Sequence, residues 1–135
     1  MTVELERLPD RPMAQSVRIG PWTLLADLSA EEGGSDSGPS PHDLYDAALG
    51  ACKALTVLWF AKRKGIAVTE IHTRVERDDS RERDGTYVLA THLAIGGPIT
   101  DAQLAQLQAV AAKCPVHKLM TLVTTQIGTT VERLP

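Results

Sequence analysis

Residues 42–65 read HDLYDAALGACKALTVLWFAKRKG and contain no proline. Apolar residues recur in this stretch every three or four positions, which is the spacing of one face of an α-helix. Three cations, Lys62 to Lys64, fall in the last turn before Gly65, a pattern typical of a helix end. We therefore expect one long helix from His42 to Lys64. Its apolar row consists of Leu44, Ala47, Ala48, Ala51, Leu55, Leu58 and Trp59.

A second row on the same helix also follows helical spacing. It consists of Tyr45, Leu49, Cys52, Thr56 and Phe60. Together the two rows place apolar or weakly polar groups over well more than half of the circumference. The pattern indicates a central helix with other elements packed around it.

Short strands are predicted on both sides of this helix. Residues 17–29 form a hairpin around the turn at Gly20 and Pro21, and the Gly-, Ser- and Pro-rich residues 31–41 form a solvated loop. Residues 66–78 and 86–97 alternate in polarity around a polar turn that ends in Asp84 and Gly85, which indicates a second hairpin.

The last third of the chain predicts two helices and a strand. Thr100 and Gln103 fit a capping box, so a helix is expected from about Asp101 to Lys113. Pro115 ends this helix and fits the first position of a short helix that continues to Leu122. Residues 124–134, TTQIGTTVERL, predict a final strand. The fold class is therefore α+β, with helices packed on antiparallel strands.

Composition limits what this chain can be. It has 135 residues, 43% of them hydrophobic and 23% charged, which predicts one globular domain over residues 1–135. A net charge of -3 gives no basic surface for nucleic acid. No apolar run resembles a signal peptide or appears long enough to cross a bilayer, so a cytoplasmic protein without membrane contact is expected.

The chain has only two cysteines, Cys52 and Cys114. Thiols in the cytoplasm stay reduced, so the pair is redox-active, metal-binding or simply buried. A metal site that draws on both thiols, His117 and His42 lacks closely spaced ligands, and we expect neither a metal nor another cofactor.

The two thiols differ in their predicted surroundings. Cys114 stands at the start of the short helix, whose free N–H groups are expected to lower the pKa of its thiol. Cys52 lies inside the long helix and needs a nearby cation or hydrogen-bond donor to become reactive. Arg18 of the first hairpin is the first candidate for this cation, with Arg11 and Lys53 behind it.

Two segments in this order are similar to one family. Residues 38–65, GPSPHDLYDAALGACKALTVLWFAKRKG, and residues 97–119, GPITDAQLAQLQAVAAKCPVHKL, resemble the OsmC/Ohr family of thiol-dependent peroxidases and related proteins. The resemblance implies an intertwined α+β homodimer with sites at the subunit interface. It also implies an organic hydroperoxide as substrate and a part in the response to oxidative stress.

The family mechanism assigns roles to both cysteines. It implies that Cys52 attacks the hydroperoxide, that Cys114 captures the sulfenic acid as a disulfide, and that a dithiol reductant resets the pair. In the family's organic hydroperoxide reductases, a hairpin arginine stabilises the thiolate, and here that residue is expected to be Arg18. We expect Tyr45 and Leu49 to form an apolar wall for the substrate beside Cys52.

One position departs from the family pattern. The reductases carry a glutamate directly after the proline to orient the arginine, whereas here His42 follows Pro41. A neutral histidine cannot hold a guanidinium by charge, and Asp43 is the alternative. Because it stands at the position of the family glutamate, His42 is a candidate substrate-binding residue. The departure also leaves a second function open, a non-enzymatic redox sensor or a protein that binds a small apolar ligand.

Overall fold

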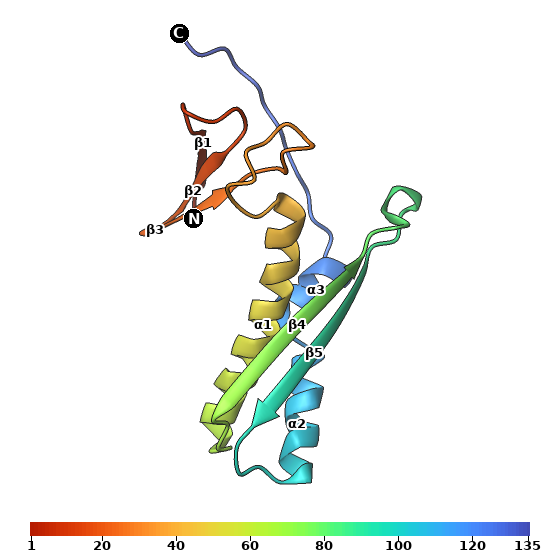
Figure 1. Ribbon diagram of the computed structural model, residues 1–135. Coiled ribbons are helices and arrows are strands. Elements are labelled where there is room, and N and C mark those ends of the chain that lie inside the picture. The colour runs from red at the N-terminus through yellow and green to blue at the C-terminus, as the bar shows by residue number, and fades with distance from the viewer. The chain divides into compact units, whose positions relative to one another are not determined.

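The computed structural model describes residues 1–135 and shows a mixed α+β chain (Figure 1). Its strands are β1 (Val3–Arg7), β2 (Gln15–Ile19), β3 (Trp22–Ala26), β4 (Glu70–Asp78) and β5 (Val88–Gly96). Its α-helices are α1 (Pro41–Lys64), α2 (Asp101–Ala111) and α3 (Pro115–Thr121), and a short 3-10 turn, η1, spans Glu82–Asp84. The expected α+β class, the long helix and both hairpins are confirmed.

The chain divides into two compact units. The first contains residues 1–50 and 74–92, and the second contains residues 51–73 and 93–135. The elements α1, β4 and β5 each contribute residues to both units.

The first unit contains an antiparallel sheet in the order β1-β2-β3. The turn after β2 uses Gly20 with a φ of +57°, a conformation that glycine adopts without strain. Strand β1 was not predicted from the sequence, although Val3 and Leu5 alternate with Glu4 and Glu6; all five of its residues are exposed.

A buried carboxylate fixes the loop that follows β3. Asp27 Oδ2 accepts hydrogen bonds from the Ser37 hydroxyl at 2.6 Å and from the Ser35 and Ser37 amides. These bonds, the Ser37 hydroxyl first, lower the pKa of Asp27 to about 2. Residues 31–41 form the exposed loop that the sequence predicts, and the Asp27 side chain binds its Ser35 and Ser37.

The second unit has an apolar core between α1, α2 and the strands. Its fully packed centre is Val57, Ala61, Ile66 and Leu107. Ile71 of β4 and Leu93 and Ile95 of β5 pack against it, as the alternation of these strands predicted. The predicted capping box is also confirmed, because Thr100 Oγ1 accepts from the Gln103 amide and Gln103 Oε1 accepts from the Thr100 amide.

The buried stripe of α1 is not the one that the sequence suggested. The buried positions are Asp46, Leu49, Gly50, Lys53, Val57 and Ala61, and of these only Leu49 belongs to a predicted row. Leu55 and Trp59 of the first row are 65% and 60% exposed. Periodicity shows that a helix has an apolar face, but it does not show which elements of the same chain cover that face.

The predicted final strand is wrong. Residues 124–134 form neither strand nor helix and are exposed. A strand needs the backbone of a neighbouring strand to bind its N–H and C=O groups, and alternating side chains do not supply one.

Helix α1 is long and apolar enough to cross a membrane, judged by length and composition only. The expectation that no segment reaches this length is therefore wrong. Core helices meet the same criterion, and two charged residues of α1, Asp46 and Lys53, are buried and bonded to other parts of the chain. Length alone does not place α1 in a bilayer.

Candidate functional site

The structure brings the two cysteines together at the start of α3. Cys52 is a half-buried residue of α1, and Cys114 is the fully buried N-cap of α3. The Val116 amide donates to Cys52 Sγ at 3.4 Å, and the His117 amide donates to Cys114 Sγ at 3.4 Å. Successive backbone N–H groups therefore each bind one thiol. Both cysteines are free thiols, not a disulfide.

The thiol of Cys114 is less acidic than the sequence suggested. Burial raises its pKa, and the neighbouring Cys52 thiol raises it further. The His117 N–H and the charge of Lys53 act in the opposite direction, but they do not outweigh burial. The expected lowering by N–H groups is present, and the expected net direction is wrong because the thiol is out of contact with water.

Lys53 is the cation that the structure places in this group of residues. It is 4% exposed, and its Nζ donates to the Ala111 carbonyl at 2.8 Å and to His117 Nδ1 at 3.0 Å. The sequence predicts Arg18 as the cation ahead of Lys53. Lysine is usually exposed, so nothing in the sequence indicated its burial.

Arg18 has a different partner. It lies on β2, where it is exposed and forms an ion pair with Glu4, the residue opposite it on β1. Its role as the activating cation stays a prediction.

The aspartate considered as a substitute for the family glutamate does hold an arginine, but one from β4. Arg77 Nη2 donates to Asp43 Oδ1 at 2.6 Å, and Arg77 Nε donates to Asp46 Oδ2 at 2.6 Å. The Tyr87 hydroxyl donates to Asp46 Oδ1 at 2.7 Å. Bonds to Ser40 and Arg77 lower the pKa of Asp43, whereas burial and then Asp46 raise the pKa of Tyr87 to about 12.

Arg77 is not among the site residues predicted from the sequence. One signal was available, because Arg77 shares a face of β4 with Ile71, Thr73 and Val75. A charged residue on the inward-facing side of an alternating strand indicates that a residue of opposite charge packs against that side.

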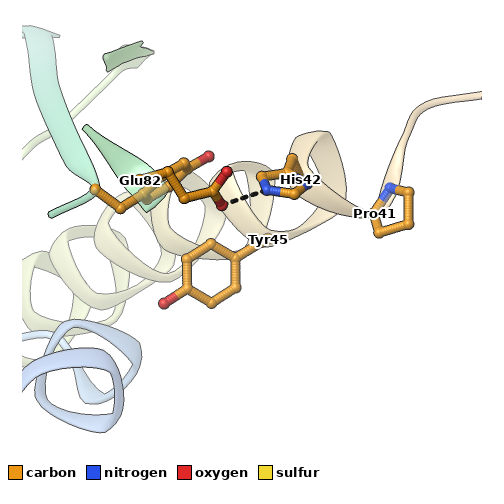
Figure 2. Close-up of a pocket in the computed structure, with 5 residues that line it drawn as sticks. Pro41, His42, Tyr45 and Glu82 are labelled. Atoms are coloured by element: carbon orange, nitrogen blue, oxygen red, sulfur yellow. Dashed lines mark hydrogen bonds and ion pairs between the residues drawn. The ribbon is translucent and has the colours of Figure 1, made fainter. Parts of the chain in front are cut away.

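His42 lies at a pocket of about 370 Å³ in the first unit. The pocket is lined by Pro41, His42, Tyr45, Glu82 and Tyr87. Figure 2 shows the imidazole turned toward the Glu82 carboxylate, with the Tyr45 ring beside them, and His42 Nε2 lies 2.6 Å from Glu82 Oε1. His42 therefore binds a carboxylate from the tip of the second hairpin, not a guanidinium.

Tyr45 lines this pocket, and Leu49 is 5% exposed. The expectation that both residues flank Cys52 stays a prediction. No group of three or more His, Cys, Asp or Glu side chains is arranged to bind a metal ion.

The pair formed by His42 and Glu82 predicts a pH dependence. The hydrogen bond and the charge of Glu82 raise the pKa of His42 above its ordinary value. The pair therefore stabilises the fold fully below the ordinary histidine pKa of about 6.5, and this stabilisation is lost as the pH rises through the raised value. Glu82→Gln is expected to return the pKa of His42 toward its ordinary value, as measured by NMR titration of the imidazole.

Glu70→Gln is the matched control, because Glu70 binds His72 with the same 2.6 Å contact. It should leave the His42 titration unchanged. An unaltered His42 titration in Glu82→Gln would show that the pair has no electrostatic effect.

Comparison with known proteins agrees with the resemblance seen in the sequence. A family model described as OsmC-like protein matches residues 34–128. The solved OsmC-like protein of Mycoplasma pneumoniae is 18% identical, with 90% of this chain and 87% of that chain covered and a TM-score of 0.72. No curated protein matches the chain in sequence.

Two solved proteins with organic hydroperoxide resistance in their names share the fold. For the Legionella pneumophila protein OsmC, identity is 20%, coverage is 90% of each chain and the TM-score is 0.61. For OhrB of Bacillus subtilis, identity is 23%, coverage is 90% of this chain and 92% of that chain, and the TM-score is 0.57. At these identities the structures show a common fold.

Proposed function

The chain belongs to the OsmC-like protein family, and on this premise we propose that it is a thiol-dependent peroxidase that reduces organic hydroperoxides. The observation that carries the proposal is the pairing of two free thiols at the start of α3, where the Val116 and His117 amides each bind one sulfur. The names of the related hydroperoxide resistance proteins support the choice of substrate.

The exposure of the two thiols supports the proposed order of reaction. Cys52 is half-buried and therefore meets the hydroperoxide, whereas Cys114 is fully buried. The Cys52 thiolate attacks the outer oxygen of the hydroperoxide, and the O–O bond breaks. The departing alkoxide takes up a proton and leaves as an alcohol. Cys52 then carries a sulfenic acid.

The second half of the cycle restores the thiols. The Cys114 sulfur attacks the sulfenic sulfur, so that a disulfide forms and water leaves. A dithiol reductant then opens the disulfide by exchange and is itself oxidised. Overall, one hydroperoxide and one dithiol become an alcohol, water and a disulfide.

Steady-state kinetics test this function. The reduced protein with a dithiol is expected to consume cumene hydroperoxide with saturable turnover, and hydrogen peroxide more slowly. The preference follows from the apolar surroundings proposed for Cys52, since the transfer of an apolar substrate out of water lowers its free energy. Oxidation that stops after one equivalent, at the same rate with both peroxides, would contradict catalytic turnover.

The pocket at His42 favours a second candidate function. Three aromatic side chains, His42, Tyr45 and Tyr87, line it together with a single ion pair. Such a pocket suits a small, largely apolar ligand. Under this alternative the protein binds a ligand without turnover, and binding survives replacement of Cys52.

We also propose that two copies of the chain form a homodimer. The support is the exposed apolar face of α1, where Leu55, Leu58 and Trp59 are 65%, 38% and 60% exposed. Exposed apolar patches of this kind mark interaction surfaces. Sedimentation velocity at low concentration tests the proposal, and a single species of 14.6 kDa would contradict it.

A further inference from the structure

Lys53 is a buried ammonium group without a carboxylate partner. Its two partners are the Ala111 carbonyl and His117 Nδ1, and none of the ion pairs in the chain includes it. A buried charge is costly unless an opposite charge compensates it. A negative charge near Lys53 would therefore be stabilising, and neither of its two partners supplies one.

The thiols are the groups that can supply this charge. Ala111 and His117, which hold Lys53, lie three residues before and three residues after Cys114. The lysine is thereby fixed beside Cys114, and its charge lowers the pKa of that thiol against the effect of burial. The titratable groups around Cys114 are Cys52 and Lys53 of α1 and His117 of α3. Among the groups that change the pKa of the Cys114 thiol, Lys53 is the one that carries a positive charge.

Lys53 also has a structural role. Ala111 is the last residue of α2, so the ammonium binds a carbonyl that the helix leaves free, where a cation is favoured. A neutral amide can donate to the same carbonyl. It cannot stabilise a thiolate by charge, and this difference separates the two roles.

We propose that Lys53, held in place by His117, is the positioning cation that stabilises the Cys114 thiolate and so controls how fast the Cys52 sulfenic acid becomes a disulfide. The inference rests on the proposed function. In the step concerned, the Cys114 thiolate attacks the Cys52 sulfur, the S–S bond forms and the S–O bond breaks. The hydroxide that leaves takes up the proton that Cys114 gave up and departs as water.

The same charge favours the return to the dithiol. Disulfide formation removes the thiolate, so Lys53 again becomes a buried cation without an opposite charge. Where Cys114 is ionised in the dithiol, this cost destabilises the disulfide relative to the dithiol and raises the reduction potential of the pair. Lys53 therefore affects both the closing of the disulfide and its reduction.

Lys53→Gln tests the inference, because glutamine keeps a donor for Ala111 and removes the charge. With cumene hydroperoxide, the formation of the Cys52 sulfenic acid and its conversion to the disulfide are timed as two separate steps. Disulfide formation should be roughly tenfold slower or more near neutral pH, because a nearby opposite charge changes ionisation by at least that factor. Dimedone should then trap the accumulated sulfenic acid, and raising the pH should restore the rate. Lys53→Arg should restore part of it, and the exposed Lys62→Gln on the same helix should have no effect.

The thiolate itself provides a test that needs no peroxidase activity. In a Cys52→Ser background, ultraviolet absorbance follows the ionisation of Cys114 against pH. Lys53→Gln should move this titration to higher pH, and an unmoved titration overturns the inference whether or not the protein reduces peroxides. If wild-type protein forms no sulfenic acid but the titration moves, the proposed function fails and the role of Lys53 stands.

If Lys53→Gln does not fold, the inference can still be tested in the Cys52→Ser variant, which keeps Lys53. The ¹⁵N resonance of Lys53 Nζ is expected to shift as Cys114 ionises, since the two charges then face each other. A resonance that does not respond to this ionisation overturns the inference.

Discussion

Replacing Cys52 by serine is expected to reduce the dithiol-dependent consumption of cumene hydroperoxide to the uncatalysed rate. The serine hydroxyl stays protonated near neutral pH and does not attack a peroxide oxygen, whereas a thiolate does. The substitution changes one atom in a half-buried side chain, so the fold should persist. The rate of hydroperoxide loss in the presence of a dithiol measures the effect.

Cys114→Ser is the matched control, because it makes the same chemical change at the second thiol of the site. It should keep the first reaction, and the protein should gain one oxygen atom in mass with each equivalent of hydroperoxide. Turnover that survives in Cys52→Ser but not in Cys114→Ser would reverse the proposed roles. Turnover in both variants would place the reaction elsewhere.

Leu107→Ala is expected to lower the free energy of unfolding by about 2 to 5 kcal/mol, the range for truncating a buried leucine. Leu107 is fully buried on α2, in the cluster with Val57, Ala61 and Ile66. Its truncation leaves a cavity between α1 and α2 in the second unit. Chemical denaturation with urea measures the change.

Leu104→Ala provides the comparison on the same helix. Leu104 is 43% exposed, so its truncation removes less buried surface and should cost no more than about 1 kcal/mol. Equal losses at the two positions would show that α2 is not anchored through Leu107.

The elements that the sequence predicts well are those with a local signal. The long helix ends at Lys64, followed by Gly65, as its charges indicated, and the capping box at Thr100 begins α2. The prediction of a final strand was wrong, because a strand needs a neighbouring strand, and the local sequence does not show whether one is present. The exposure of Leu55 and Trp59 was missed for a similar reason, since burial depends on what packs against a helix face.

The candidate site was predictable only in part. The order of Cys52 and Cys114 pointed to one site through family resemblance, and the structure places both thiols at the start of α3. The raised pKa of Cys114 depends on the depth of burial, which a sequence does not report. Lys53 was a secondary candidate for the cation, and its burial depends on contacts with Ala111 and His117 that a sequence does not report.

The most direct test of the account is a single turnover of the reduced wild-type protein with one equivalent of cumene hydroperoxide, followed by intact mass and peptide mapping without reductant. The account predicts the loss of two hydrogen atoms and one peptide pair that joins Cys52 to Cys114, with neither change in Cys52→Ser. A product that retains two free thiols while the hydroperoxide persists, or a disulfide between chains through Cys52 alone, would contradict it.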